Sequence, residues 1–248
     1  MTAPRPHFPP EALRFLRALS RNNERDWFRQ RRESYDSVVR GPMVAVIEQL
    51  DRDFRAFAPD LVASPKLSLY RIYRDTRFSE DKSPLKTHIG AFFPHRALPK
   101  NESPGLYLEV NTRTVLAAGG LYMPTSPQLH AIRSHLLGNV GRFRSLVEAP
   151  AFRRVTGGLQ GDQLLRVPRG FPPDDPAADY LRYRQFLVWR EWPASLATSP
   201  RFYATVLGLF RTAAPLVGFL CEPLLGRPSA PARPPRFPET RHDLRRRS

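Results

Sequence analysis

The chain of 248 residues is 41% apolar and 11% aromatic, which is enough to form a hydrophobic core. Its single cysteine, Cys221, excludes an internal disulfide framework and a cysteine-based metal site. The formal net charge of +16 attracts polyanions but requires no nucleic-acid partner, since salt screens such attraction.

The N-terminal segment and the hydropathy pattern are those of a soluble, cytoplasmic protein without a membrane partner. The first residues, MTAPRPHFPPEAL, lack the positively charged start and the continuous apolar core of a signal peptide. No uninterrupted run of about eighteen apolar residues occurs along the chain. We therefore expect a globular protein inside the cell.

Three helices are predicted in the first quarter of the chain. They span Glu11 to Leu19, a segment capped by Asn22 or Asn23 that runs to Val39, and Gly41 to Phe57. Apolar residues in the third helix recur at the helical period, which indicates that it faces the core. The solvated side of the second helix is assigned to Arg25, Arg29, Arg31 and Arg32.

After these helices the pattern changes to strands. Candidate strands are Leu67 to Tyr73, His88 to Phe93, Gly105 to Val110, Thr114 to Tyr122 and, late in the chain, QFLVW at 185–189. Asn111 to Arg113 has the composition of a short hairpin connection, so the strands on either side of it are predicted antiparallel neighbours. Gly119 and Gly120 are expected to bend the second of them.

Further helices are predicted on both sides of the last strand. Ser126 is the expected cap of a section of two or three helices that reaches Arg154. A long ordered loop is predicted over residues 157–179, which are rich in Gly, Pro and Asp. The amphipathic closing helix begins after Ser199 and Pro200, and Pro215 is expected to kink or split it.

Together these elements predict an α+β fold. A mostly antiparallel sheet packs against N-terminal and C-terminal helices in a single domain over residues 1–225. Residues 226–248 are predicted to be a disordered, Pro- and Arg-rich tail. The tail holds seven arginines against Glu239 and Asp243, so it carries +5 of the net charge and the body carries the remaining +11.

The segment Tyr70 to Phe93, YRIYRDTRFSEDKSPLKTHIGAFF, concentrates groups that can bind a charged ligand. It joins two predicted strands, and loops held by a rigid scaffold commonly position reactive groups. All four lysines of the chain fall between residues 66 and 100, although 39 residues are basic. Lysine and arginine are not interchangeable at a tight site. The candidate site is therefore placed at this rim of the sheet.

On the functional interpretation, the side chains of this rim clamp a phosphate or carboxylate group. The predicted ligand-binding residues are Arg71, Arg74, Lys82, Lys86 and Glu109. The predicted catalytic residues are His88, as a proton donor, and Asp75, which orients the arginines. If the strand face that carries Arg71 is buried, its guanidinium requires a partner.

On the structural interpretation, Asp75 and Asp81 cap turns and pair with neighbouring cations, so that nothing binds. Arg77 and Glu80 are assigned to structure. No metal is assigned, because His95, His130 and His135 lack the spacing of metal ligands, although His88, Glu109 and an aspartate can still meet in space. The sequence has no nucleophile elbow and no phosphate-binding glycine loop, and it assigns no cofactor and no reaction.

At RIYRDTRFSEDKSPLKTHIGAFF the chain resembles an uncharacterised, mainly bacterial family, the domain of unknown function 2461. FLRALSRNNERDWFRQRRESY before this motif, and GGLYMP and RVPRGFPPDDPAADYLRYRQF after it, follow the family's order over about residues 8–222. The chain departs from the pattern at WREWPAS and at Arg184, where a lysine is usual. The resemblance implies a single compact α+β domain in the cytoplasm, and it implies no activity.

Two functions from different classes fit these observations. The first is binding of a small anionic ligand at residues 71–88, by an enzyme or a degenerate relative of one. The second is a nucleic-acid-binding accessory protein that uses the basic body and the arginine-rich tail on phosphates. A non-catalytic scaffold is a third. The first is preferred because cations, acids and His88 gather in one segment.

Overall fold

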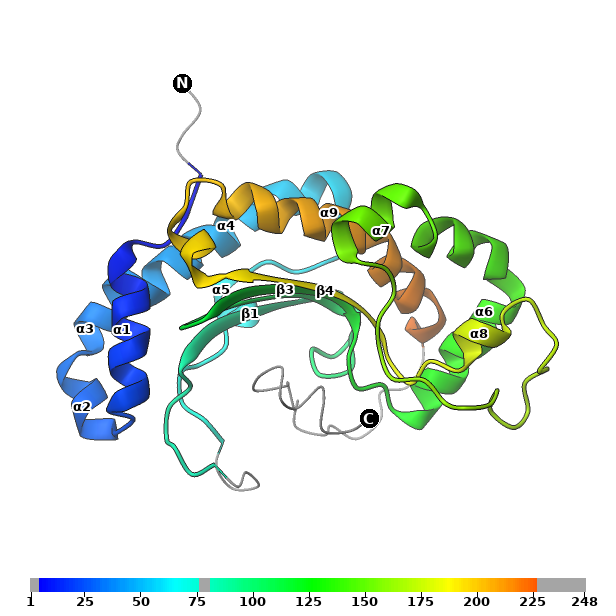
Figure 1. Cartoon of the computed structure of the whole chain (residues 1–248), viewed down its shortest axis with the longest axis horizontal. Coiled ribbons are helices and arrows are strands. Elements are labelled where there is room, and N and C mark those ends of the chain that lie inside the picture. The colour runs from blue at the N-terminus through cyan, green and yellow to red at the C-terminus, as the bar shows by residue number, and fades with distance from the viewer. Residues whose placement is uncertain (1–4, 76–80, 227–248) are drawn as a thin grey trace. The chain divides into compact units, whose positions relative to one another are not determined.

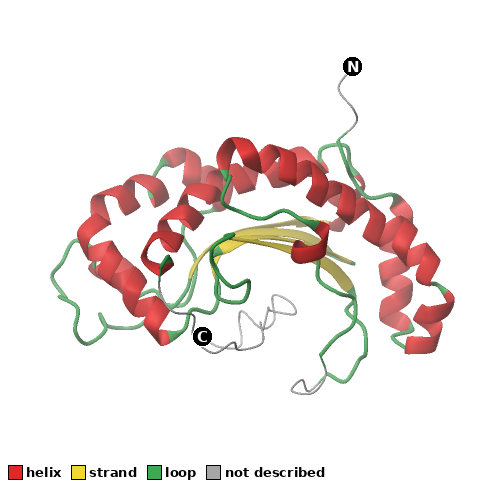
Figure 2. Ribbon diagram, turned by 180° about the vertical axis from the view of Figure 1, so that it is seen from behind, coloured by secondary structure: helices red, strands yellow, loops and turns green. Residues whose placement is uncertain are grey.

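The computed structural model describes residues 5–75 and 81–226. Its four strands form one antiparallel sheet in the order β1-β2-β3-β4, and the α+β fold class is thereby confirmed. The strands are β1 (His88–Pro94), β2 (Gly105–Asn111), β3 (Thr114–Leu121) and β4 (Phe186–Pro193). Figure 2 shows them in yellow, lying side by side.

The chain divides into two compact units. Unit 1 comprises Met1–Phe93, Tyr107–Ala117 and Arg190–Arg211, and unit 2 comprises Pro94–Leu106, Ala118–Trp189 and Thr212–Ser248. A single domain over residues 1–225 stays a prediction. Residues 227–248 of the tail predicted over 226–248, together with Arg77 and Glu80, lie outside the described residues.

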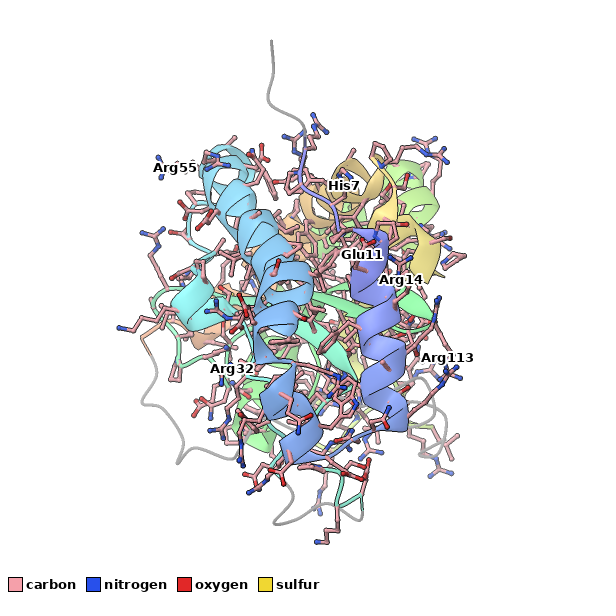
Figure 3. The ribbon with its side chains drawn as sticks, turned by 90° about the vertical axis from the view of Figure 1, so that its left-hand side faces the viewer. His7, Glu11, Arg14, Arg32, Arg55 and Arg113 are labelled. Atoms are coloured by element: carbon pink, nitrogen blue, oxygen red, sulfur yellow. The ribbon has the colours of Figure 1, made fainter. Side chains whose placement is uncertain are left out.

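Unit 1 begins with a run of helices. They are α1 (Pro10–Arg21), α2 (Arg25–Gln30), α3 (Arg32–Tyr35), the π-helical turn η1 (Asp36–Arg40), α4 (Gly41–Phe57) and α5 (Pro65–Ser68). The predicted second helix is therefore three short pieces. Its arginines are exposed, as expected. Figure 3 shows the outer side of these helices, where Arg14, Arg32 and Arg55 form ion pairs with acids one turn away.

The core of unit 1 lies between α4, the first half of α9 (Phe202–Cys221) and one face of the sheet (Figure 1). The ring of Phe54 lies 5.4 Å from that of Phe93, and Phe93 lies 5.7 Å from Phe210. Because successive residues of a strand point to opposite faces, Ile89 and Ala91 share this buried face with Phe93. His88 and Gly90 point to the other face.

Two local predictions in unit 1 are wrong because tertiary contacts outweigh local preference. Residues 67–73 do not form a strand, since Pro65 starts the helical turn α5 and the chain then makes only the isolated bridges Leu69↔Ala91 and Tyr73↔Leu85. Asn23 does not cap α2, whose N-cap residue is Glu24. The Asn23 side chain instead bonds the backbone of Leu85.

Unit 2 contains α6 (Ser126–Val147), α7 (Pro150–Thr156) and α8 (Ala178–Leu181), with the second half of α9. The cap of α6 is Thr125, one residue before the predicted Ser126, and it forms a capping box with Gln128. Asn139 interrupts α6 with non-helical angles. The ring of Phe143 lies 5.0 Å from both Tyr180 and Phe219, which gives this unit its aromatic core.

The helix α9 continues through Pro215. Phe202–Leu224 is long and apolar enough to cross a membrane. However, 61% of its most apolar 18-residue stretch is buried inside the fold. Arg211 interrupts this stretch, which is why the sequence shows no unbroken apolar run. The helix is therefore placed as the core helix of a soluble domain.

Gly120 on β3 lies directly against the backbone of β4. It adopts a φ of +128°, and a Cβ atom there would lie 2.0 Å from the Phe186 carbonyl oxygen. Both its angle and its surroundings therefore require glycine. By contrast, a Cβ atom on Gly138 in α6 would meet no heavy atom within 4 Å.

We expect Gly120→Ala to lower the free energy of unfolding by more than about 2 kcal/mol, because β3 and β4 must separate to admit the methyl group. Gly138→Ala should be neutral or raise it by up to about 1 kcal/mol, because alanine favours the helix. Urea unfolding of both variants checks this. Equal effects of the two substitutions would contradict the role assigned to Gly120.

An ion-pair cluster joins α6 to the turn η3 (Glu222–Leu224) within unit 2. Arg142 donates to both oxygens of Glu222, with Nη1 2.7 Å from Oε2, and His135 Nε2 lies 3.0 Å from the same Oε2. The hydrogen bond from Arg142, supported by the charges of Arg142 and His135, lowers the pKa of Glu222.

A lowered folded-state pKa stabilises the fold above the ordinary glutamate value of about 4.5, and this stabilisation is lost as the pH falls through the folded-state value. We expect Glu222→Gln to lower the free energy of unfolding by about 1 kcal/mol at pH 7, with the difference from the wild type shrinking as the pH falls below the ordinary glutamate pKa. Unfolding series at several pH values measure it. Glu48→Gln, at an exposed position on α4, is the control and should show no such pH dependence.

Candidate functional site

The two segments that flank the predicted rim run antiparallel to each other in unit 1. Besides the bridges at Leu69 and Tyr73, the Tyr70 amide donates to the Gly90 carbonyl at 3.0 Å. The amides of Lys86 and Arg74 donate to Ile72 and Pro84 at 2.8 and 3.0 Å. The pairing places residues 71–75 beside residues 81–88, so the two charged stretches share one edge.

Asn23 fastens this edge to the N-terminal helices. Its Nδ2 donates to the Leu85 carbonyl at 2.9 Å, and its Oδ1 accepts from the Leu85 amide at 3.0 Å. One asparagine side chain thus makes the two hydrogen bonds to the Leu85 backbone that a neighbouring strand would make. The ring of Phe28 packs edge-on against Tyr73 at 6.1 Å. The rim is therefore held by helices that come much earlier in the chain.

Arg74 is paired within the rim. Its side chain is 9% exposed, and Nη1 lies 2.5 Å from Oδ2 of Asp81. Hydrogen bonds from the side chain and the backbone of Ser83, and then the charge of Arg74, lower the pKa of Asp81. The pairing of Asp81 with a neighbouring cation matches the structural interpretation of the sequence. The other predicted residues of this stretch, Arg71, Asp75 and Lys82, are exposed.

A buried carboxylate lies on the face of β2 that points away from α4 and α9. Glu109 is 3% exposed and accepts hydrogen bonds on both oxygens. The hydroxyl of Tyr107 donates to Oε2 at 2.7 Å, and Nδ2 of Asn111 donates to Oε1 at 3.0 Å. His88, on the adjacent strand β1, has its Nε2 3.8 Å from Oε2 and a side chain that is 13% exposed.

Gly90 makes room for this arrangement. A Cβ atom there would lie 2.9 Å from the Tyr107 hydroxyl, so any other residue would displace the phenol from its place over β1. Burial, followed by the charge of Glu109, raises the pKa of Tyr107. The phenol therefore stays protonated and keeps donating to the carboxylate.

Lys86 reaches the same face. Its Nζ lies 5.0 Å from the ring centroid of Tyr70, which is a cation–π distance, and the Tyr70 ring lies 6.4 Å from that of Tyr107. Burial raises the pKa of Tyr70 well above its ordinary value. We call the group formed by Tyr70, Lys86, His88, Tyr107, Glu109 and Asn111 the polar cluster.

The structure thus brings together three of the seven predicted site residues, Lys86, His88 and Glu109. Arg74 joins Asp81 at the rim. Sequence reasoning missed the donors to Glu109. The alternation of Tyr107, Glu109 and Asn111 on one predicted strand places them on one face, but it does not show that all three form one hydrogen-bonded group. In the described ranges, 5–75 and 81–226, no three His, Cys, Asp or Glu side chains gather as metal ligands.

The fold and this cluster define an α+β protein with a buried polar group on one face of an antiparallel sheet. Residues 11–219 match the family of conserved hypothetical proteins named DUF2461, so the chain belongs to that family. The resemblance at RIYRDTRFSEDKSPLKTHIGAFF is thereby confirmed. No curated protein and no solved structure matches the chain.

Tyr107→Phe tests the cluster by removing one donor to a buried carboxylate. We expect the free energy of unfolding to fall by about 1–3 kcal/mol, because the Glu109 oxygen loses its closest hydrogen bond. Urea unfolding measures the change. The matched control is Tyr73→Phe, at a residue that is 43% exposed, where the change should be within about 0.5 kcal/mol. A neutral Tyr107→Phe would contradict the hydrogen bond's contribution.

Proposed function

We propose that the protein binds a small anionic ligand, bearing a phosphate or carboxylate group, where the rim meets the polar cluster. The observation that carries the proposal is the placement of Lys86 and His88. Thr87 between them lies at a bend, and both side chains reach groups of the polar cluster. Lys86 is half-buried over the Tyr70 ring and His88 lies against Glu109.

The charge of the rim supports an anion. Residues 71–75 and 81–88 hold four cations, Arg71, Arg74, Lys82 and Lys86, against Asp75 and Asp81, which gives +2 with His88 neutral. Counting the buried Glu109 leaves +1. Arg74 and Asp81 neutralise each other, so the exposed Arg71 and Lys82 give the approach to the cluster its positive sign.

The arrangement also gives the cations different roles in the proposed binding. Lys86 contacts the ligand as a point charge, whereas Arg71 and Lys82 at the exposed edge draw it in. The ion pair between Arg74 and Asp81 stabilises the conformation of the rim. We place this binding in the cytoplasm, where phosphorylated and carboxylated metabolites are abundant, and we propose phosphate esters and small carboxylic acids as the ligand class.

A thermal-shift experiment with inorganic phosphate, citrate and a nucleoside monophosphate tests the proposal. A ligand present at one hundred times its Kd stabilises the fold by about 2.7 kcal/mol, which raises the Tm by about 5–10 °C for a chain of this size. We expect at least one of these compounds to do so. Lys86→Gln should remove most of the shift, and Lys66→Gln, at an exposed lysine on α5, should keep it.

Two results would contradict the proposal. One is that none of the compounds shifts the wild type, and the other is that both lysine variants respond alike. Duplex DNA serves as a further probe. If DNA binds with a steep salt dependence that Lys86→Gln leaves unchanged, the basic surface rather than the polar cluster is the binding region.

A further inference from the structure

Arg133 on α6 is a buried cation of unit 2. The residue is 8% exposed and follows Ala131 and Ile132, which are also buried. A guanidinium carries five N–H donors and keeps its charge in proteins. Nη2 donates to the backbone carbonyl of Tyr183 at 2.9 Å, whereas Nε is enclosed and makes no hydrogen bond to a described residue. Arg133 therefore has more donors than the described part of the chain has acceptors for them.

Three more exposed arginines of unit 2 have the acidic partners that Arg133 lacks. Between 35% and 53% of each of their side chains is exposed, and their ion pairs are Arg142 with Glu222, Arg144 with Glu148, and Arg182 with Asp179. Water already solvates such charges, so these pairs contribute little to stability. Within residues 5–75 and 81–226, Arg133 forms no ion pair, and its one hydrogen bond goes to a neutral carbonyl. The most buried of the four cations thus has no counter-charge.

A buried charge of this kind favours binding of an anion. Charged groups inside proteins are normally paired or fully hydrogen-bonded, because the loss of hydration is costly. Burial also lowers the pKa of the Arg133 guanidinium, which shows in which direction its surroundings act on the charged form. A negatively charged group that accepts the unused N–H donors offsets this cost.

The acceptor carbonyl of Tyr183 belongs to a stretch of backbone that is held in place. The amide of Leu164 donates to the Arg182 carbonyl at 2.8 Å, and the amide of Arg184 donates to the Asp162 carbonyl at 2.8 Å. The hydrogen bond from Arg133 to Tyr183 therefore fixes one end of the guanidinium against paired backbone.

An irregular loop borders the same face of α6. The ring of Phe171, in the loop 157–179, lies 5.4 Å from that of His130. His130 precedes Arg133 by three residues, so the two side chains are neighbours on one face of the helix. The loop thus passes beside Arg133. Next to Tyr183, the side chain of Arg184 is exposed and adds a positive charge at the surface.

We infer that Arg133 binds the carboxylate group of a small organic acid beside the loop 157–179. This second anion site belongs to unit 2, whereas the polar cluster belongs to unit 1, so it goes beyond the proposed function. The planar fork of a guanidinium matches the two oxygens of a carboxylate. One buried positive charge neutralises one negative charge, and a doubly charged phosphate leaves a further negative charge to bury. The exposed Arg184 attracts the acid to this surface.

Acetate is the probe, tested by thermal unfolding against chloride at equal ionic strength. The experiment uses Lys86→Gln, because this substitution removes the response expected of the polar cluster. A ligand at ten times its Kd raises the folding equilibrium constant about tenfold, which raises the Tm by about 3–6 °C for a chain of this size. We expect acetate to do so and inorganic phosphate to give a smaller shift.

Arg133→Gln, added to Lys86→Gln, should abolish the acetate shift, because glutamine carries no charge. Arg133→Lys keeps the charge without the planar fork, so it should retain part of the shift, and it replaces Arg133→Gln if that variant does not fold. The matched control is Arg153→Gln, at an exposed arginine on α7 of the same unit, which should keep the full shift. Urea unfolding verifies that each variant folds.

The outcomes separate this inference from the proposed function. An acetate shift that is absent in Lys86→Gln, or equal after Arg133→Gln and Arg153→Gln, overturns the site at Arg133. A phosphate shift larger than the acetate shift overturns its assignment to carboxylates. The single variant Arg133→Gln should keep the ligand response that depends on Lys86, so the anion site of unit 1 stands or fails independently.

Discussion

The buried carboxylate of Glu109 is the constraint on which the rest of this face of the sheet depends. An ionised group out of contact with water is tolerated only when donors and opposite charge surround it. Tyr107 and Asn111 supply the donors, Lys86 brings a positive charge to the same face, and His88 Nε2 lies 3.8 Å from the carboxylate. Replacing the carboxylate by an apolar side chain would leave these groups without the partner that arranges them.

The same face is connected to distant parts of unit 1 through backbone pairing. Residues 69–75 lie along residues 84–91, and Asn23 bonds Leu85 from the N-terminal helices. The cations of the rim are thus positioned both by backbone pairing and by the turn between α1 and α2 that carries Asn23. A movement of the helices α1 to α3 would act directly on the segment that enters β1.

The sequence predicts those parts of the fold that are determined by interactions between residues close together in the chain. The helical period of Gly41–Phe57 and the hairpin at Asn111 were readable because adjacent residues determine them. The sequence around Asn23 predicts a helix cap, whereas its side chain bonds Leu85, a residue 62 positions away that no local pattern identifies. The charges of this segment fit either a ligand clamp or ion pairs within the loop. The pairing of Arg74 with Asp81 belongs to the second interpretation, and it depends on the course of the loop, which local sequence does not determine.

Gly90 leaves the space in which the hydroxyl of Tyr107 reaches Glu109. The hydroxyl of Tyr107 occupies the space that a side chain at position 90 would fill. Position 90 and the Tyr-x-Glu-x-Asn alternation of β2 are therefore linked by volume. In this chain a side chain at position 90 would have to displace the phenol that donates to Oε2 of Glu109. The hydrogen bond to a carboxylate on β2 therefore depends on the absence of a side chain on the neighbouring strand β1.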